Sequence, residues 1–513
     1  MQHQDNVIDY SRKWYVMAAV AMGIFLATID GSIVNVALPT LTRQLGADFP
    51  TVQWVVLAYL LTLATLLLSV GRLADMIGKK PIYMVGFVVF TLGSALCGLA
   101  PDIHWLIGTR VFQAIGASMV LALGMAIVTE AFPPSERGKA LGISGAIVSV
   151  GIVLGPTLGG LIIGSLSWRW IFFVNLPVGI VGTLMVLRFV PAIRPRGGQR
   201  FDYWGALTLL LSLLALLLGL TLGQRIGFGS AQVLGLIAAW AAFLIAFLLI
   251  ESRSRQPMID LQLFQNRLFS VNLVTGFITF IAIAGTIILM PFYLENILGY
   301  APQQVGLMLA VVPVALGLTA PLSGALSDRF GTRPITVSGL AMLAIGYFAV
   351  SSLSVGTSGL GYVLRFLPIG LGMGIFQSPN NSAIMGTAPR DRMGIVSGML
   401  ALNRTLGQTT GIAVLGAIWA SRTFTLAGQS FSGGATSAPA VAQVAALHDV
   451  FLGVVVLVLA GLRLAIWAVA HERRGRLASK LRNEPAQWHS QRETGCASVP
   501  DHVLPGLFDG LLE

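Results

Sequence analysis

The chain has 513 residues, of which 55% are apolar and only 10% are charged, and its formal net charge is +11. A soluble protein carries about 25% charged residues, so this composition excludes a large soluble enzyme and indicates that lipid is the main solvent. The basic residues form short clusters between apolar runs, without a basic face of interleaved aromatic residues, which argues against nucleic acid as a partner.

Apolar runs long enough to cross a bilayer begin near residue 15 and recur to about residue 470. A helix needs about 20 apolar residues to span the hydrocarbon core, and only helices and closed barrels satisfy their backbone there. The first run is too long for the core of a signal peptide and lacks a small-residue cleavage pattern, so we expect it to be retained. Counted in this way, the sequence predicts an all-α membrane protein with fourteen transmembrane helices.

Lysine and arginine residues are unevenly shared between the two sets of alternating loops. One set holds clusters, such as Lys79 with Lys80 and the basic tail from Arg473 to Arg482, whereas the other set holds single residues such as Arg43 and Arg422. Cytoplasmic loops of membrane proteins carry the excess of basic residues, and here the bias keeps one direction along the whole chain. We therefore predict a multi-pass protein of the bacterial plasma (inner) membrane with both termini in the cytoplasm.

An internal repeat divides the chain. Residues 71–81 read GRLADMIGKKP, and residues 324–334 read GALSDRFGTRP, at an offset of 253. Arg110 and Arg365 both lie in apolar runs and are 255 residues apart, and the same offset relates PSER at 134–137 to PRDR at 389–392. Three pairs at nearly one spacing indicate two homologous halves.

The repeat predicts the domain organisation. We expect a cytoplasmic N-terminus over 1–13, a six-helix bundle over 14–195, two linker helices with cytoplasmic loops over 196–264, a second six-helix bundle over 265–475, and a disordered cytoplasmic tail over 476–513. Two duplicated bundles suit alternating access, in which one half rocks against the other around a site near the bilayer midplane.

Four motifs resemble those of the major facilitator superfamily, in particular its fourteen-helix drug/proton antiporters. They are the helix-1 motif at 30–39, the loop between helices 2 and 3 at 71–80, the helix-4 motif at 106–117 and the helix-5 exporter motif at 151–160. The resemblance covers about residues 14–470. It implies two six-helix bundles with two additional helices, and a secondary active exporter that exchanges protons for small lipophilic molecules such as drugs.

Charged residues inside the spans are candidates for proton coupling and substrate binding, because a buried charge costs at least about 2.5–3.5 kcal/mol in a bilayer. Burial disfavours the ionised form of Asp30, which could therefore take and release a proton; the alternative is a structural partner for an arginine. Arg110 stays protonated at any working pH, and the resemblance implies that it assists proton transfer. Glu295 stands where family members commonly have Gln, and is either a second acidic site near the outer vestibule or a carboxylate that reaches the interface. Arg365 and Arg404 are further charges within the spans, and no role follows for them.

The repeated loops hold the candidate gating residues, which are Gly71, Asp75, Gly78, Lys79, Asp328, Gly331 and Arg333. Asp75 would hold a neighbouring helix N-terminus or an arginine while the inner gate is shut, with Asp328 as a weaker counterpart. The alternative is a tight, solvated turn flanked by basic anchors.

The helix-5 motif contributes Gly151, Gly155, Pro156, Gly159 and Gly160. The glycine spacing gives one smooth helix face for close packing, and the proline permits a bend because it lacks a backbone donor. Ordinary helix packing would explain this face, and the resemblance favours a hinge or a seal against proton leakage.

The sequence offers no sign of an enzyme or of a cofactor other than the proton as coupling ion. It has no Walker motif, and no two histidines have metal-ligand spacing within a span. The expected partners are the lipid bilayer, a small-molecule substrate and protons, and the sequence leaves open a periplasmic adaptor protein. An exporter of one specific metabolite, lipid or siderophore would have the same sequence features. A channel or a membrane-embedded enzyme fits less well, because the duplicated loops imply two-sided gating and no filter loop or catalytic cluster is visible.

Overall fold

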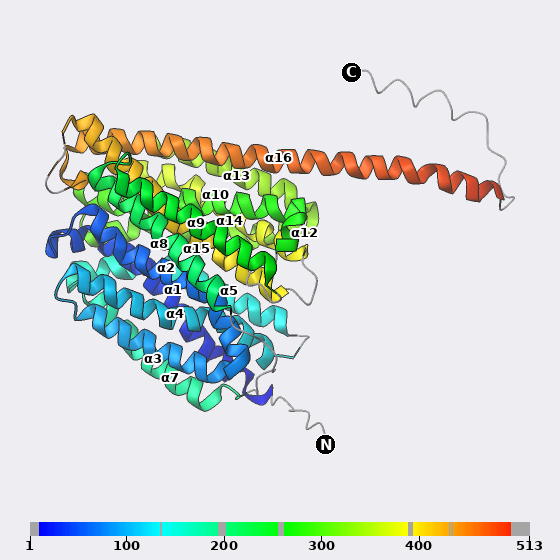
Figure 1. Ribbon diagram of the computed structural model, residues 1–513, viewed down its shortest axis with the longest axis horizontal. Coiled ribbons are helices and arrows are strands. Elements are labelled where there is room, and N and C mark those ends of the chain that lie inside the picture. The colour runs from blue at the N-terminus through cyan, green and yellow to red at the C-terminus, as the bar shows by residue number, and fades with distance from the viewer. Residues whose placement is uncertain are drawn as a thin grey trace.

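The computed structural model describes residues 10–133, 136–192, 202–254, 261–387, 393–429, 431 and 434–493. Every regular element in these ranges is a helix, and fourteen spans are long and apolar enough to cross a membrane, which confirms the predicted all-α fold and the span count. The helices lie side by side, and the C-terminal helix protrudes at the end of the molecule where the first helix begins (Figure 1).

Six spans make up the N-terminal half, and a one-turn 3-10 helix, η1 (Tyr10–Arg12), precedes them. These spans are α1 (Lys13–Gln44), α2 (Phe49–Ile77), α3 (Lys79–Gly98), α4 (Ile103–Ala131), α5 (Arg137–Ser165), and the pair α6 (Trp170–Phe173) and α7 (Asn175–Phe189), which together form the sixth.

Two linker helices and six further spans follow. They are α8 (Tyr203–Ile226) and α9 (Ala231–Arg253), then α10 (Arg267–Phe292) continued by the π-helix η3 (Tyr293–Ile297), α11 (Pro302–Leu309) with α12 (Val311–Phe330), α13 (Thr332–Val350), α14 (Gly359–Gly386), α15 (Met393–Ala427) and α16 (Ala440–Glu493). The short 3-10 helices η2 (Leu261–Gln265) and η5 (Ala435–Ser437) lie in the connections before α10 and α16.

The two repeated loops have the same backbone geometry. Gly78 ends α2 with φ 109° and ψ 147°, and Gly331 ends α12 with φ 87° and ψ 154°. Each glycine also precedes the next helix directly. Positive φ values of this kind are open to glycine and strained for other residues, so the same residue type closes the same turn in both halves.

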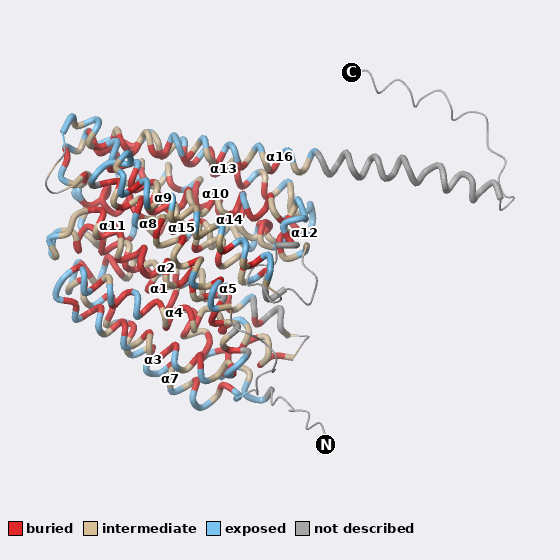
Figure 2. The backbone as a smooth tube through the Cα atoms, in the orientation of Figure 1, coloured by how far each residue is buried: buried red, intermediate tan, exposed pale blue. Residues whose placement is uncertain are grey.

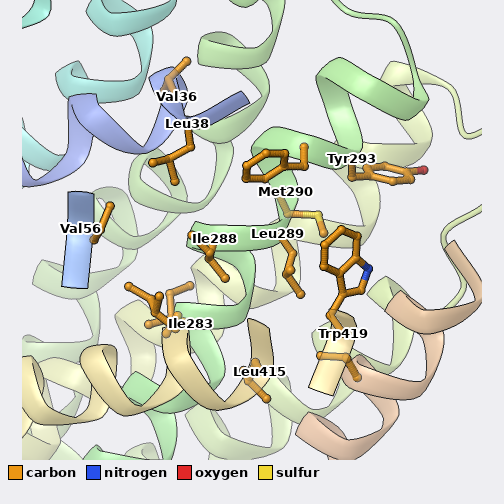
Figure 3. Close-up of a cluster of buried hydrophobic side chains, with 14 of the residues drawn as sticks. Val36, Leu38, Val56, Ile283, Ile288, Leu289, Met290, Tyr293, Leu415 and Trp419 are labelled. Atoms are coloured by element: carbon orange, nitrogen blue, oxygen red, sulfur yellow. The ribbon is translucent and has the colours of Figure 1, made fainter. Parts of the chain in front are cut away.

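The halves meet at the end of the bundle that holds residues 45–48 and 298–301, which we call the outer end because the charge pattern predicts it to lie outside. Phe49 of α2 makes edge contacts with Phe292 of α10 and with Trp419 of α15, at ring-centroid distances of 5.2 and 4.9 Å. Val36 and Leu38 of α1 belong to the same apolar cluster, which reaches through α10 to α15 (Figure 3). This cluster therefore seals the outer end in the present conformation.

A second contact between the halves is a crossing of glycines. The backbones of α5 and α11 approach so closely that a Cβ atom on Gly160 would lie 3.0 Å from the Cα atom of Gly306. A Cβ atom on Gly306 would overlap the carbonyl oxygen of Pro156 and lie 3.1 Å from the Cα atom of Gly160. Small residues allow this approach, as in other membrane helix pairs.

The linker helix α8 packs against α2 of one half and α15 of the other. Gln224 of α8 donates a hydrogen bond of 3.4 Å to the side-chain oxygen of Gln53, whose side chain fills the space beside Gly416 of α15. Helix α9 lies outside this contact, with only 11% of its span buried. Buried residues gather in the interior of the stack, and exposed residues follow its borders (Figure 2).

The predicted disordered tail needs one correction. The backbone of α16 remains helical to Glu493, beyond the expected boundary at 476, whereas residues 494–513 lie outside the described residues. Most residues of the segment after the last span are good helix formers such as Ala, Leu, Arg, Lys, Gln and Glu, but it also contains Gly475 and Pro485, so composition alone does not explain the continued helix. The other predicted domain boundaries remain predictions.

The glycine crossing yields a prediction for the outer seal. Gly306→Ala is expected to shift the molecule away from this closed arrangement, because overpacked contacts cost about 1–3 kcal/mol and the neighbouring atoms are backbone. Gly317→Ala is the matched control, because a Cβ atom there would meet nothing within 4 Å.

Pulsed electron–electron double resonance measures this shift as the distance between two spin labels. The labels replace Leu166 and Leu360, which are exposed on the two halves at the outer end. Cys97 is buried, so a Cys496→Ser background leaves the two introduced cysteines as the labelling sites. We expect longer distances in Gly306→Ala alone. A distribution identical to that of the Gly317→Ala control would show that the crossing does not hold the seal.

Candidate functional site

Asp30 lies in the interior of the N-terminal half, at the centre of a network of hydrogen bonds. Its side chain is 0% exposed, and its Oδ2 atom lies 2.6 Å from Nη1 of Arg110, which is 1% exposed. Its Oδ1 atom accepts hydrogen bonds from the side-chain amides of Gln113 at 2.8 Å and Asn175 at 3.1 Å. The carboxylate of α1 therefore connects to α4 and α7 through one cation and two neutral donors.

Arg110 has partners on further elements. Its Nε atom donates to the carbonyl oxygen of Val55 on α2 at 3.1 Å, and its Nη1 atom also donates to Oε1 of Gln113 at 2.6 Å. The guanidinium carbon lies 4.0 Å from the centre of the Tyr59 ring, a distance at which the ring face attracts a cation. The guanidinium of Arg110 is thus surrounded by the Asp30 carboxylate, two amide carbonyl oxygens and the face of the Tyr59 ring.

Ser94 of α3 completes the network. Its hydroxyl accepts from Asn175 at 2.9 Å and from Gln113 at 3.2 Å, and donates to the backbone oxygen of Phe172 at 2.9 Å. Our sequence reasoning placed Gln113 in the helix-4 motif but missed Ser94 and Asn175 as site residues. The available signal was a lone amide side chain, Asn175, in an apolar span, where an unpaired polar group is costly.

The structure therefore brings together Asp30 and Arg110, two of the predicted coupling residues, in an arrangement that fits the structural alternative for Asp30, a partner for a membrane arginine. A buried ion pair is retained at low cost only when its remaining donors and acceptors are satisfied, and removal of one partner leaves an uncompensated charge. The surrounding amides and hydroxyl provide that satisfaction here. The network connects the carboxylate on α1 with groups on four other helices, α2, α3, α4 and α7.

The helix-5 glycines pack α5 against the same helix that carries Asp30. A Cβ atom on Gly155 would lie 2.8 Å from Cβ of Ser32, and a Cβ atom on Gly159 would lie 2.8 Å from Cγ1 of Ile33. Ser32 also donates a hydrogen bond of 3.2 Å to the backbone oxygen of Gly151. Gly160 and Pro156 face α11 instead, so α5 has one close-packed face on α1 and another on the C-terminal half.

Glu295 forms a separate site at the outer end. It lies in the π-helix that ends the α10 span, and its Oε1 atom accepts from Arg43 of α1 and, at 3.5 Å, from the hydroxyl of Thr40. The Glu295 side chain is 5% exposed, and that of Arg43 is 53% exposed. Since Thr40 lies ten residues, or about 15 Å, along α1 from Asp30, the two acidic candidates are not brought together.

The predicted gating residues are only partly described. Lys79 forms an ion pair with Glu130 at the end of α4, and Arg333 lines a small hollow together with Asn272. Asp328 is exposed and has no hydrogen bond or ion pair within the described part of the chain. A Cβ atom on Gly71 would meet nothing within 4 Å. The side chain of Asp75 lies outside the described residues, so the latch remains a prediction.

Arg365 and Arg404, the two further membrane charges singled out in the sequence, differ from Arg110. Arg365 donates to the hydroxyl of Ser352 and to the backbone oxygen of Gly361, each at 3.0 Å, within its own half at the outer end. Arg365 therefore occupies the position equivalent to Arg110 in the second half, but no carboxylate pairs with it among the described residues. Arg404 on α15 is partly exposed, and among the described residues it has no hydrogen bond, ion pair or ring contact.

A double-mutant cycle tests whether Asp30 and Arg110 act as one unit. Asp30→Asn and Arg110→Gln are each expected to lower the free energy of unfolding by about 3–5 kcal/mol, because each leaves a buried partner uncompensated. The double variant is expected to lose less than the sum of the two, as measured by the apparent Tm of purified protein.

The exposed pair of Arg422 and Asp449 is the matched control, with side chains 45% and 38% exposed. Its neutral variants, Arg422→Gln and Asp449→Asn, should each change stability by no more than about 1 kcal/mol. Additive losses for Asp30→Asn and Arg110→Gln would contradict the view that the pair is a unit.

Comparisons with known proteins agree with this architecture. Residues 20–412 match the family model of the Major Facilitator Superfamily. The chain is 35% identical over 414 residues to the riboflavin transporter RibZ of Clostridioides difficile, with 80% of this chain and 89% of the relative covered. It is also 36% identical to the multidrug resistance protein Stp of Mycobacterium tuberculosis, with coverage of 79% and 75%, and 31% identical to the multidrug transporter protein MdtP of Bacillus subtilis, with coverage of 80% and 76%.

Solved structures support the fold. A bacterial homologue of the human lysosomal transporter Spinster, in an inward-facing and unoccupied conformation, superposes with a TM-score of 0.63 at 19% identity, covering 89% of this chain and 97% of that one. The family match extends over most of the chain, and the relatives exceed 30% identity over most of their own length. The chain therefore belongs to the Major Facilitator Superfamily and is a fourteen-span membrane transporter of that family, not an enzyme.

Proposed function

We propose that this transporter is a secondary active exporter in the plasma membrane, with both termini in the cytoplasm, that exchanges protons for small lipophilic molecules. The observation that carries the proposal is the fully buried Asp30 carboxylate, which pairs with Arg110 and accepts from two amides. It is the ionisable acid at the centre of a helix network, whereas Glu295 is engaged at the outer end.

Protonation of Asp30 would change the contacts of α1. A neutral carboxyl loses its ionic attraction to Arg110 and gains a hydrogen that must find an acceptor, while Gln113 and Asn175 still present donors to it. Arg110 keeps its charge and would depend on Val55, Gln113 and the Tyr59 ring. The protonated and ionised forms therefore favour different positions of α1 relative to α4.

A movement of α1 would reach the contact between the halves. The glycine face of α5 leaves no free space against Ser32 and Ile33, so a shift of α1 displaces α5 with it. The other face of α5 forms the crossing with Gly306 of α11. Packed elements of this kind change between discrete arrangements, as alternating access requires.

The proton gradient is large enough for the proposed task. One charge moved across 100 mV is worth ~2.3 kcal/mol, so one proton provides roughly 3.5 kcal/mol at about 150 mV. That free energy supports a roughly 300-fold concentration gradient of a neutral substrate.

The relatives favour two substrate classes. Stp and MdtP have names that describe multidrug resistance and transport, which supports a range of lipophilic compounds. RibZ is named for riboflavin, and its 35% identity favours an exporter of one specific metabolite as the second candidate.

Proton exchange in inverted membrane vesicles tests the proposal. Addition of a substrate from a panel of lipophilic cations and neutral drugs is expected to dissipate an acid-inside pH gradient in the wild type. Asp30→Asn should abolish this response, because an amide cannot exchange a proton at working pH.

Asp102→Asn is the control for the same chemical change, because Asp102 is an exposed helix cap and Asn caps helices equally well. Its response should equal that of the wild type. If Asp30→Asn responds like the wild type, Asp30 is not the coupling residue, and Glu295→Gln is the next variant to test. No response to any compound in the wild type would contradict antiport of this substrate class.

A further inference from the structure

We propose that Arg404 and Gln408 of α15 form an oxyanion-binding site in the C-terminal half, which takes the carboxylate or phosphate group of an amphipathic molecule. The inference deepens the proposed function and rests on it in one respect, namely that a transported molecule enters between the two halves. The site lies apart from Asp30 and uses no residue of its network.

Arg404 carries a charge with no compensating partner among the described residues. Arg404 is the twelfth residue of a helix that crosses the membrane, and it has no described partner. The two acidic residues singled out in the spans, Asp30 and Glu295, are engaged elsewhere, with Arg110 and with Arg43. An arginine in a membrane pairs with an anion or with backbone oxygens, or reaches water, because its isolated charge is costly there.

The neighbours of Arg404 on α15 show which way its face of the helix is directed. Asn403 donates to the backbone oxygen of Leu273, and a Cβ atom on Gly407 would lie 2.7 Å from Cβ of Phe280, so both face α10. Ala401 packs against the apolar cluster of the N-terminal half. At 100° per residue, Arg404 lies about 100° from Asn403 in one direction around the helix and about 60° from Ala401 in the other, so it lies between them. It therefore faces the space where α10 and the N-terminal half meet.

Gln408 supplies a second hydrogen-bond donor beside Arg404. Gln408 follows Arg404 by four residues, so the two side chains share one face of α15. Gln408 is also partly exposed, and no hydrogen bond of its side chain occurs within the described ranges. A guanidinium with a neighbouring amide offers several N–H donors and one positive charge, which suits a carboxylate or a phosphate.

The depth of the site fits entry from the inner side. Trp419, which belongs to the outer seal, lies fifteen residues or about 22 Å further along α15. The pair of donors is thus on the inner side of the seal in the present conformation. A charged group bound there would leave the apolar part of the molecule against the helices around it.

Two sources could supply the oxyanion, the transported molecule or the headgroup of an anionic lipid. The test uses naphthalene-1-carboxylate and its uncharged carboxamide as a matched pair of probes. Apparent Tm is measured against probe concentration in nanodiscs of phosphatidylcholine, for the wild type, Arg404→Gln, Arg404→Lys and Arg463→Gln. Arg463 is an exposed arginine of the same half and is the control.

We expect the carboxylate to stabilise the wild type and Arg463→Gln, with a Kd about 10- to 100-fold weaker in Arg404→Gln, as the loss of a charge-assisted hydrogen bond implies. Arg404→Lys should keep part of the effect, and the carboxamide should not distinguish the variants. The lipid source is tested by adding phosphatidylglycerol to the nanodiscs. If this lipid stabilises the protein in a way that depends on Arg404, and the carboxylate has no effect, the site belongs to a lipid headgroup. Equal effects of the two probes, or no dependence of either anion on Arg404, would overturn the proposal.

The same probes separate this inference from the proton-coupling proposal, because binding is measured without a pH gradient. Binding that depends on Arg404, with no exchange of protons in vesicles, would leave the oxyanion site standing and count against antiport. Proton exchange for cations, with no binding of the carboxylate or of phosphatidylglycerol, would support antiport and count against the oxyanion site.

Discussion

The ion pair between Asp30 and Arg110 is the interaction on which the N-terminal half depends. Two opposite charges lie beyond the reach of solvent, and each is stable there only because the other is present and because Gln113, Asn175 and Ser94 satisfy the remaining donors and acceptors. Such a pair contributes little net stability compared with apolar packing. Under the proposed function, its use would be proton coupling.

The helix packing connects this pair to the contact between the halves. Helix α1 carries Asp30 on one side and Ser32 and Ile33 on another, where the glycines of α5 leave no free volume. Helix α5 in turn crosses α11 at Gly160 and Gly306. The apolar seal around Phe49 and Trp419 and the amide contact of linker helix α8 lie at the same outer end. Of the two extra helices of the fourteen-span architecture, α8 is therefore part of the interface, since it contacts both halves.

Much of this architecture could be predicted from the sequence, because the bilayer imposes a strong and simple constraint. Span length and loop charge predicted fourteen helices, and the repeat aligned Gly78 with Gly331, where the structure has equivalent turns. The pairing of Asp30 with Arg110 was foreseeable as a possibility, since a membrane arginine needs an anion. Asn175 and Ser94 were missed because a single polar residue in an apolar run does not indicate which helix it will face. The helical continuation of the tail was also missed, since its polar composition suits either a solvated helix or a disordered chain.

The most direct test of the account is whether Asp30 changes its protonation state when a substrate binds. Infrared difference spectroscopy of the protein in proteoliposomes detects the C=O stretch of protonated carboxyl groups, and Asp30→Asn identifies the contribution of that residue. We predict that addition of a transported compound removes a protonated-carboxyl band in the wild type and that no such band changes in Asp30→Asn. A difference spectrum that is the same in both proteins would contradict the assignment of Asp30 as the coupling site.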